Sequence, residues 1–131
     1  MAGLRRTIKI KVRNGMAKKK QKPGKKTYEV IEKHYPKVIK AVEALGTTVR
    51  GAGPLDEKTS HLIQLAAAAA TGSEGAVHSH TRRAKKAGAT PEEITHALLM
   101  LISTIGFPQA MAAISWSRDI LETEEKDKDK E

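Results

Sequence analysis

The chain has 131 residues, which is enough for one ordinary domain and too few for two. It contains no cysteine, which excludes disulfides, thiolate metal sites and thiol-based catalysis, and which weakly favours a reducing, cytoplasmic location. Only 3% of the residues are aromatic, so we expect a core of Ala, Leu, Ile and Val, which suits closely packed helices in a small subunit that oligomerises. No apolar run approaches the ~18 residues of a membrane span, and we expect no secretory signal and no membrane contact.

The net charge of +9 is distributed unevenly. Residues 1–26 carry +11, residues 27–121 carry +1 and residues 122–131 carry −3. We therefore expect a flexible basic N-terminal arm, a helical domain over 27–121 and a charged C-terminal tail. A run of like charges is usually a solvated tail, and this is the interpretation we favour for the arm. The alternative is a phosphate-binding arm for nucleic acid, and a start at Met16 would shorten that arm.

The domain segment begins with an interrupted helix. Val30, Val38, Val42 and Leu45 recur near helical spacing over residues 27–45. The same segment contains Pro36, which divides or kinks a helix, and it is followed by Gly46, a suitable residue to end one. Residues 47–55 contain three Gly and Pro breakers, so we expect a loop there.

Four more helices are predicted from capping residues, apolar spacing and glycine stops, and no strand pair is evident. The expected fold class is therefore all-α, with about five to six helices. The start and stop signals are Asp56 to Gly72, Ser73 to Gly88, Thr90-Pro91-Glu92-Glu93 to Gly106, and Pro108 onward through Leu121.

Four histidines fall on these predicted helices, namely His61, His78, His80 and His96. His78 and His80 are two positions apart, so their side chains point about 200° apart and cannot both face one site. Glu74 shares a face with His78. The pair is either a simple i,i+4 contact or two weak candidate metal ligands without a third.

His80 is the better candidate for chemistry, because an imidazole with a pKa near neutrality can act as acid or base. Ser73 shares a face with His80 and could be its hydroxyl partner, although a helix N-cap is the expected role of that hydroxyl. The spacing shows neither an orienting acid nor an oxyanion hole. A structural or interface role for His80 is therefore an equal alternative.

The sequence resembles the carboxymuconolactone decarboxylase family, whose superfamily also contains the alkylhydroperoxidase D-like proteins. The resemblance covers about residues 28–121 and is most specific from His80 to Ile94. It implies an alkylhydroperoxidase D-like helical bundle that forms an obligate homo-oligomer, either a homotrimer or a homohexamer. The segments that carry it are Asp56–Ala68, Gly72–His80, Thr81–Ile94, Ala97–Leu99 and Gly106–Pro108.

Two activities are known for this family. One branch decarboxylates 4-carboxymuconolactone without a cofactor, by acid/base chemistry; the other is a peroxidase with two cysteines, a downstream histidine and an upstream relay glutamate. Position by position, the resemblance places the histidine at His80, the cysteines at Ser73 and Ala76, and the glutamate at His61. Without a thiolate no sulfenic acid or disulfide can form, which excludes the peroxidase and peroxiredoxin chemistry.

The resemblance therefore implies a cofactor-independent acid/base enzyme that acts on a small carboxylated molecule, in the manner of a decarboxylase-like lyase. His80 would be the main acid/base group and His61 its partner, with Ser73 and Glu74 as neighbours at the edge of the site. We expect no cofactor and no bound metal. The alternative is a non-catalytic oligomeric scaffold, or a small-ligand-binding protein, that has lost the redox centre of the family.

Two basic features lie close to these positions. Arg50, in the loop expected before the second helix, is a candidate to bind a carboxylate on charge alone. The run Arg82, Arg83, Lys85 and Lys86 is expected to be a solvated face or a subunit rim rather than a site.

Overall fold

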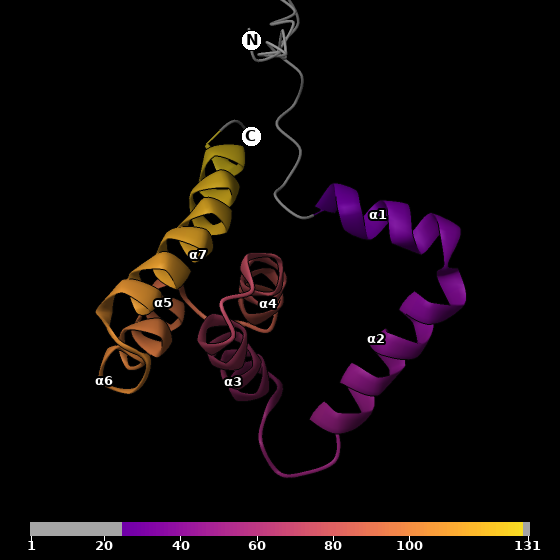
Figure 1. The fold of residues 1–131 in the computed structure, drawn as a ribbon, viewed down its shortest axis with the longest axis horizontal. Helices are drawn as coiled ribbons and strands as arrows, with labels where there is room; N and C mark the ends of the chain where they lie inside the picture. The colour runs from indigo at the N-terminus through magenta and orange to yellow at the C-terminus, as the bar shows by residue number, and fades with distance from the viewer. Residues whose placement is uncertain (1–24, 130–131) are drawn as a thin grey trace, which may run out of the picture.

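The computed structural model describes residues 25–129, which form seven α-helices and no strand (Figure 1). The all-α fold class is thereby confirmed. None of the helices in this part of the chain is long and apolar enough to cross a membrane. The helices are α1 (Lys25–His34), α2 (Pro36–Arg50), α3 (Glu57–Ala70), α4 (Glu74–Lys86), α5 (Pro91–Leu99), α6 (Ile102–Ile105) and α7 (Phe107–Lys128).

The N-terminal arm and the C-terminal tail expected from the sequence lie only partly within the described residues 25–129. Residues 1–24 of the basic arm lie outside them, whereas Lys25 and Lys26 form the start of α1. At the other end, α7 continues past residue 121 to Lys128. Arg118 donates two hydrogen bonds to Glu122 across this boundary, at 3.0 and 2.6 Å, and such an i,i+4 pair supports the continued helix.

The helices α1 and α2 form a hairpin that stands apart from the other five (Figure 1). Pro36 separates them as expected, and Tyr35 before it leaves the helical region with φ −133° and ψ 56°. The Tyr28 hydroxyl donates to the Glu43 carboxylate and ties the two helices together, and this hydrogen bond raises the pKa of Tyr28. No residue of either helix is buried.

The end of α2 corrects an expectation. Gly46 lies inside the helix, which continues to Arg50 instead of stopping at Leu45. Val49 repeats the apolar spacing of Leu45 one turn later, and the Thr48 hydroxyl donates to the Ala44 carbonyl at 2.8 Å. Arg50 is therefore held in the last turn of a helix rather than in a loop.

The core lies among α3, α4, α5 and α7, with α4 packed against both α3 and α7 (Figure 1). Ala68 and Ala69 of the alanine run in α3 are buried, so these small side chains allow the neighbouring helices to approach closely. The buried residues that form one contiguous core cluster are Leu65, Ala68, Ala69, Val77, Ala84, Ala89, Ile94, Leu98, Ala113, Ile114 and Leu121.

The expected helix caps are confirmed. Asp56 accepts from the Thr59 amide at 2.7 Å, and Ser73 accepts from the Ala76 amide at 3.4 Å. Thr90 and Glu93 form the full capping box. These caps fix where α3, α4 and α5 begin, and with them the angular position of every side chain along each helix.

The segment between α5 and α7 differs from the expectation of one continuous helix up to Gly106. The helix α5 ends at Leu99, and the four-residue α6 follows a short turn. No glycine or proline marks this break in the sequence. Gly106 does end the segment, and its φ of 94° is a conformation that other residues rarely adopt.

A buried hydrogen bond joins α4 to α7. The Thr81 hydroxyl donates to the Ser117 hydroxyl at 3.1 Å, and the two residues are 0% and 2% exposed. We expect Thr81→Val to lower the free energy of unfolding by about 1–3 kcal/mol, because it leaves a buried hydroxyl without its partner. Adding Ser117→Ala removes the unpaired hydroxyl and should restore part of the lost free energy of unfolding. Urea denaturation measures both effects, and an unchanged midpoint for Thr81→Val would contradict the assigned role.

Candidate active site

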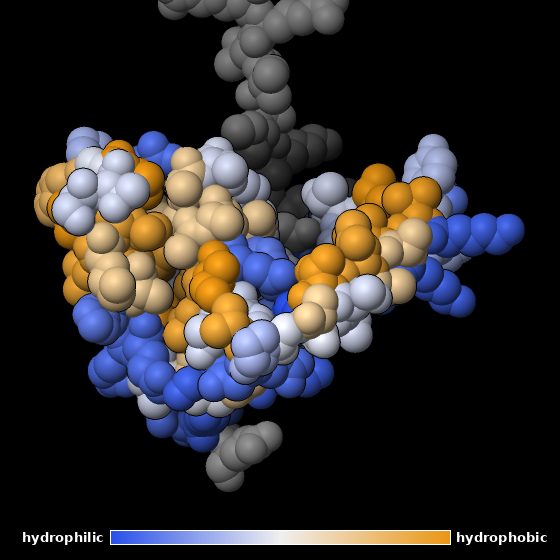
Figure 2. Space-filling model, turned by 90° about the horizontal axis from the view of Figure 1, so that it is seen from below, coloured by the Kyte–Doolittle hydropathy of each residue, from blue (hydrophilic) through white to orange (hydrophobic). Residues whose placement is uncertain are grey.

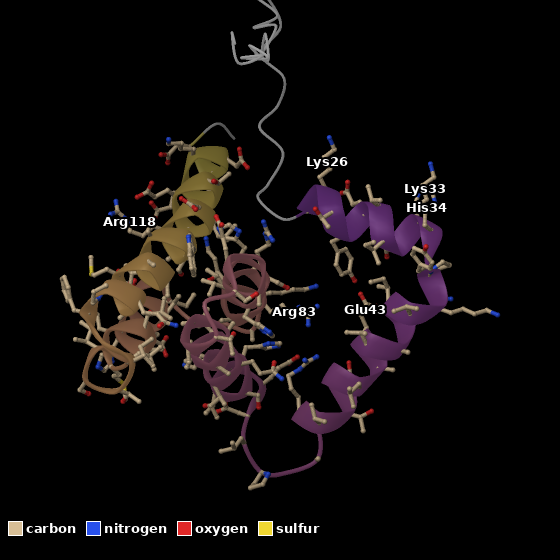
Figure 3. All side chains as sticks on the ribbon, viewed as in Figure 1. Lys26, Lys33, His34, Glu43, Arg83 and Arg118 are labelled. Carbon is tan, nitrogen blue, oxygen red and sulfur yellow. The ribbon has the colours of Figure 1, made fainter. Side chains whose placement is uncertain are left out.

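A cleft of about 400 Å³ separates α2 from α3 and α4. Three cationic side chains line it against two carboxylates, and one of these, Glu43, already accepts a hydrogen bond from Tyr28. Figure 3 shows Arg83 on α4 and Glu43 on α2 extending toward each other across the space between these helices. The lining residues are Glu43, Thr47 and Arg50 from α2, Glu57 and His61 from α3, and Arg83, Lys86 and Ala87 from α4 and its end.

His61 lies at the α3 wall of this cleft and is only 4% exposed. Its Nε2 is 3.9 Å from the Glu57 carboxylate, one helical turn earlier. Burial lowers the pKa of His61, and the positive charges of Arg50 and Arg83 lower it further, whereas Glu57 raises it. The net effect is a lowered pKa of His61, which favours its neutral imidazole.

His80 is electrostatically coupled to the same group. Burial lowers its pKa from 6.5 to about 4, with further contributions from Arg83, His61 and Arg50. At neutral pH His80 is therefore an uncharged imidazole. The structure thus places His61 and His80 in one electrostatic environment, in which the charges of Arg50 and Arg83 act on both.

Three buried polar atoms on α3 and α4 have no hydrogen-bond partner among residues 25–129: His61 Nδ1, His80 Nδ1 and Gln64 Oε1. Burying such a group unpaired costs about 1–3 kcal/mol, so native proteins rarely leave several together. Gln64 follows His61 by three positions and was not singled out in the sequence. Its spacing on α3 is the signal that could have found it.

Ser73 and Glu74, expected at the edge of the same site, have other contacts. The Ser73 hydroxyl caps α4, which is the role expected for it. The Glu74 carboxylate is 4.0 Å from Nε2 of His78, as the shared helix face predicted. His78 also lies 3.2 Å from the Asp119 carboxylate on α7, on the opposite side of α4 from the cleft.

The basic run is exposed or half-exposed, and two of its residues reach the cleft. Arg83 and Lys86 are three positions apart, so they lie on neighbouring directions of α4 and both line the cleft. Arg50 also lines the cleft, as its proposed role requires. Asp119 could not be found from the sequence, because only the packing of α7 on α4 brings it to His78.

The fold and the cleft define a class of protein: an all-helical bundle without cysteine, in which two arginines at a cleft lower the pKa of a buried and of a half-buried histidine. Residues 36–119 match the model of the carboxymuconolactone decarboxylase family, and the chain belongs to this family.

Similar proteins support this assignment. The crystal structure of the apo form of a carboxymuconolactone decarboxylase family protein from Legionella pneumophila superposes with a TM-score of 0.63 and 28% identity, covering 75% of this chain and 88% of that one. An uncharacterized protein of Methanocaldococcus jannaschii is 35% identical over 88 residues, which is 67% of this chain and 82% of the relative. An uncharacterized protein of Haemophilus influenzae is 38% identical over 60 residues, which is 46% of this chain and 53% of the relative.

The lowered pKa of His80 predicts how stability depends on pH. Between pH 6.5 and about 4 the unfolded chain binds a proton that folded His80 does not, so the free energy of unfolding falls as the pH falls. The slope is at most about 1.4 kcal/mol per pH unit from this one group. Urea denaturation at pH 7.5, 6 and 5 should show the decline, and His80→Gln should flatten it. An imidazole signal of His80 that titrates near pH 6.5 in NMR would refute the prediction.

Proposed function

We propose that the cleft binds a small carboxylated molecule and that His61 and His80 carry out cofactor-independent acid/base chemistry on it. The observation that carries this proposal is a cleft lined by His61, Arg50 and Arg83, with His80 close enough that all three contribute to its lowered pKa. Membership of the carboxymuconolactone decarboxylase family supports a decarboxylase-like lyase.

The charges of the cleft favour an anionic ligand. Arg50, Arg83 and Lys86 line it from two helices, and a guanidinium group matches a carboxylate with two parallel hydrogen bonds. A bound carboxylate offsets the positive charge that now destabilises the protonated histidines. His61 lines the cleft beside these cations, so its ring is the imidazole next to a ligand held there.

The chemistry fits a β-keto acid, in which the carboxylate is on the carbon next to a carbonyl group, or a vinylogous acid, in which a double bond extends that arrangement. When the bond from carbon to the carboxylate breaks, CO₂ leaves and its electron pair moves onto the carbonyl oxygen as an enolate. A guanidinium group stabilises that developing charge. The reaction is complete when the carbon accepts a proton, which a protonated histidine delivers.

The pKa of His80 responds to the ligand. Two of the four causes that lower it to about 4 are the charges of Arg83 and Arg50. An anion between these groups counters both, so the pKa of His80 rises when the ligand binds and the imidazole takes up a proton. His80 is thus a base in the free protein and becomes the proton donor in the complex.

This function predicts a loss of turnover on substitution of His80. We expect His80→Gln to lower kcat/KM by about 10²- to 10⁴-fold, the usual contribution of acid/base groups, and Arg50→Ala to act mainly through KM. The assay is CO₂ release from 4-carboxymuconolactone and from smaller β-keto acids. His96→Gln, an exposed histidine on α5, is the matched control and should retain activity.

The same experiment tests the alternative of a small-ligand-binding protein. If carboxylates shift the NMR signals of His61 and His80 but release no CO₂, the binding half of the proposal stands and the enzymatic half fails. If no carboxylate of the panel perturbs either histidine, both halves fail and the scaffold alternative is favoured.

We also propose that the chain functions as a homo-oligomer, a trimer or hexamer. The apolar residues of α2 form a continuous stripe at spacings of four, three and four, and this stripe is exposed: Val38 55%, Val42 60%, Leu45 63% and Val49 53%. Figure 2 shows hydrophobic surface gathered along the hairpin and again on the facing part of the bundle. Isolated helices shorter than about 12–15 residues are marginal in water, so the 10-residue α1 and the 15-residue α2 need a packing surface.

Oligomerisation through the hairpin has a direct test. The full chain should sediment as a trimer or hexamer of the 14.3 kDa subunit, and Val42→Asp with Leu45→Asp should shift it to smaller species. The physical reason is that full burial of one such side chain contributes about 1.5–3 kcal/mol, which a buried carboxylate reverses. Lys40→Glu, on the opposite face of α2, is the control and should leave the mass unchanged. A wild-type monomer at micromolar concentration would contradict the proposal.

A further inference from the structure

The side of α4 that faces away from the cleft holds a second group of polar side chains. His78 is buried at 1% exposure, and its Nε2 lies 3.2 Å from the Asp119 carboxylate of α7 and 4.0 Å from the Glu74 carboxylate of α4. One ligand atom from each of the three residues lies within 4.8 Å of the other two. Neither the acid/base site nor the helix packing described above uses this arrangement.

We propose that Glu74, His78 and Asp119 bind a divalent metal ion of the zinc type at the junction of α4 and α7. The donor set is one imidazole nitrogen and two carboxylate oxygens, which suits ions that accept both nitrogen and oxygen ligands. Three protein ligands leave further coordination positions for water or for a ligand atom.

The burial of His78 separates this group from an ordinary surface cluster of acids. Its ring is enclosed by the packing of the helices, and Nδ1 has no partner within residues 25–129, so Nε2 is the atom that reaches the two carboxylates. A neutral imidazole carries at most one proton on Nε2, and that N–H can donate only one well-aligned hydrogen bond. Two carboxylates converge on that nitrogen from two different helices, and a divalent cation neutralises the repulsion between them.

The distances fit a metal with little rearrangement. Two donor atoms about 2.1 Å from one ion lie roughly 3.0–3.4 Å apart in tetrahedral or octahedral geometry, and the gap between His78 and Asp119 is 3.2 Å. The longer gaps involve Glu74, whose side chain is 58% exposed and can change rotamer. The two less adjustable ligands are thus the ones already at coordination spacing.

The helices that carry the ligands are fixed relative to each other. One turn beyond His78, the buried hydrogen bond between Thr81 and Ser117 joins α4 to α7. Arg118, next to Asp119 in the sequence, is turned to Glu122 by its two hydrogen bonds. The site is therefore held by the fold and does not have to be assembled by the ion.

Zn²⁺ is the probe that tests this proposal. The untagged full chain, freed of metal with a chelator, should bind one Zn²⁺ per subunit in isothermal titration calorimetry at pH 7. Asp119→Asn and Glu74→Gln should each weaken that binding by at least about tenfold, since even the loss of an outer-shell partner costs 10- to 100-fold. Both side chains are about half exposed, so these variants keep the core, and circular dichroism confirms that they fold.

The chain provides a matched control. Glu57 and His61 form the same i,i+4 pair on α3, with a separation of 3.9 Å, but no third acidic or histidine ligand joins them within the described residues. Glu57→Gln should leave the affinity for Zn²⁺ unchanged, and so should His80→Gln. The proposal is overturned if the wild type binds no Zn²⁺ stoichiometrically, or if binding survives Asp119→Asn and Glu74→Gln and is lost in His80→Gln, which would place the ion in the cleft.

Discussion

The rotation of α4 about its own axis is the constraint on which both polar sites depend. Each residue of an α-helix turns the side-chain direction by 100°, so the phase set by the packed residues fixes the direction of all others. That rotation turns His78 toward Asp119 of α7 and His80 toward Arg83, His61 and Arg50, which contribute to its lowered pKa. Two histidines only two positions apart thereby enter separate chemical environments. The residues whose packing fixes this rotation of α4 are Val77, Thr81 and Ala84, all 0% exposed.

The environment of His80 contains no cysteine, unlike the redox centre that the family resemblance implies for the peroxidase branch. Ser73 and Ala76 occupy the positions that the family resemblance assigns to cysteines, and both have structural roles. The Ser73 hydroxyl caps α4, and Ala76 packs against the core. His61 at the cleft and His80 near it remain, and burial and the positive charges of Arg83 and Arg50 act in the same direction on the pKa of His80. Such a site stabilises negative charge and has no group that can exchange electrons.

Local signals in the sequence accounted for most of the fold, because caps and stops act over one helical turn. Asp56, Ser73 and Thr90 defined where helices begin, and the all-α class followed from periodicity. The failures were of two kinds. Gly46 suggests a helix stop, but the apolar spacing continues to Val49 and the Thr48 hydroxyl bonds the Ala44 carbonyl, so these local signals outweigh the weak preference of one glycine. Asp119 was not singled out, because its proximity to His78 depends on the packing of two helices 41 residues apart in sequence.

The hairpin links the proposed assembly to the proposed chemistry. The cleft has one wall on α2, which supplies Arg50, and that helix has no buried residue in the single chain. A helix without packing does not hold a guanidinium group in place, so a subunit that covered the apolar stripe of α2, as proposed above, would also fix Arg50. The two walls of the cleft thus have different sources of rigidity. The α3 and α4 wall is held by the core of its own chain, whereas the α2 wall depends on whatever covers the stripe. Anion binding in the cleft should therefore be coupled to oligomerisation, since each stabilises the same position of α2.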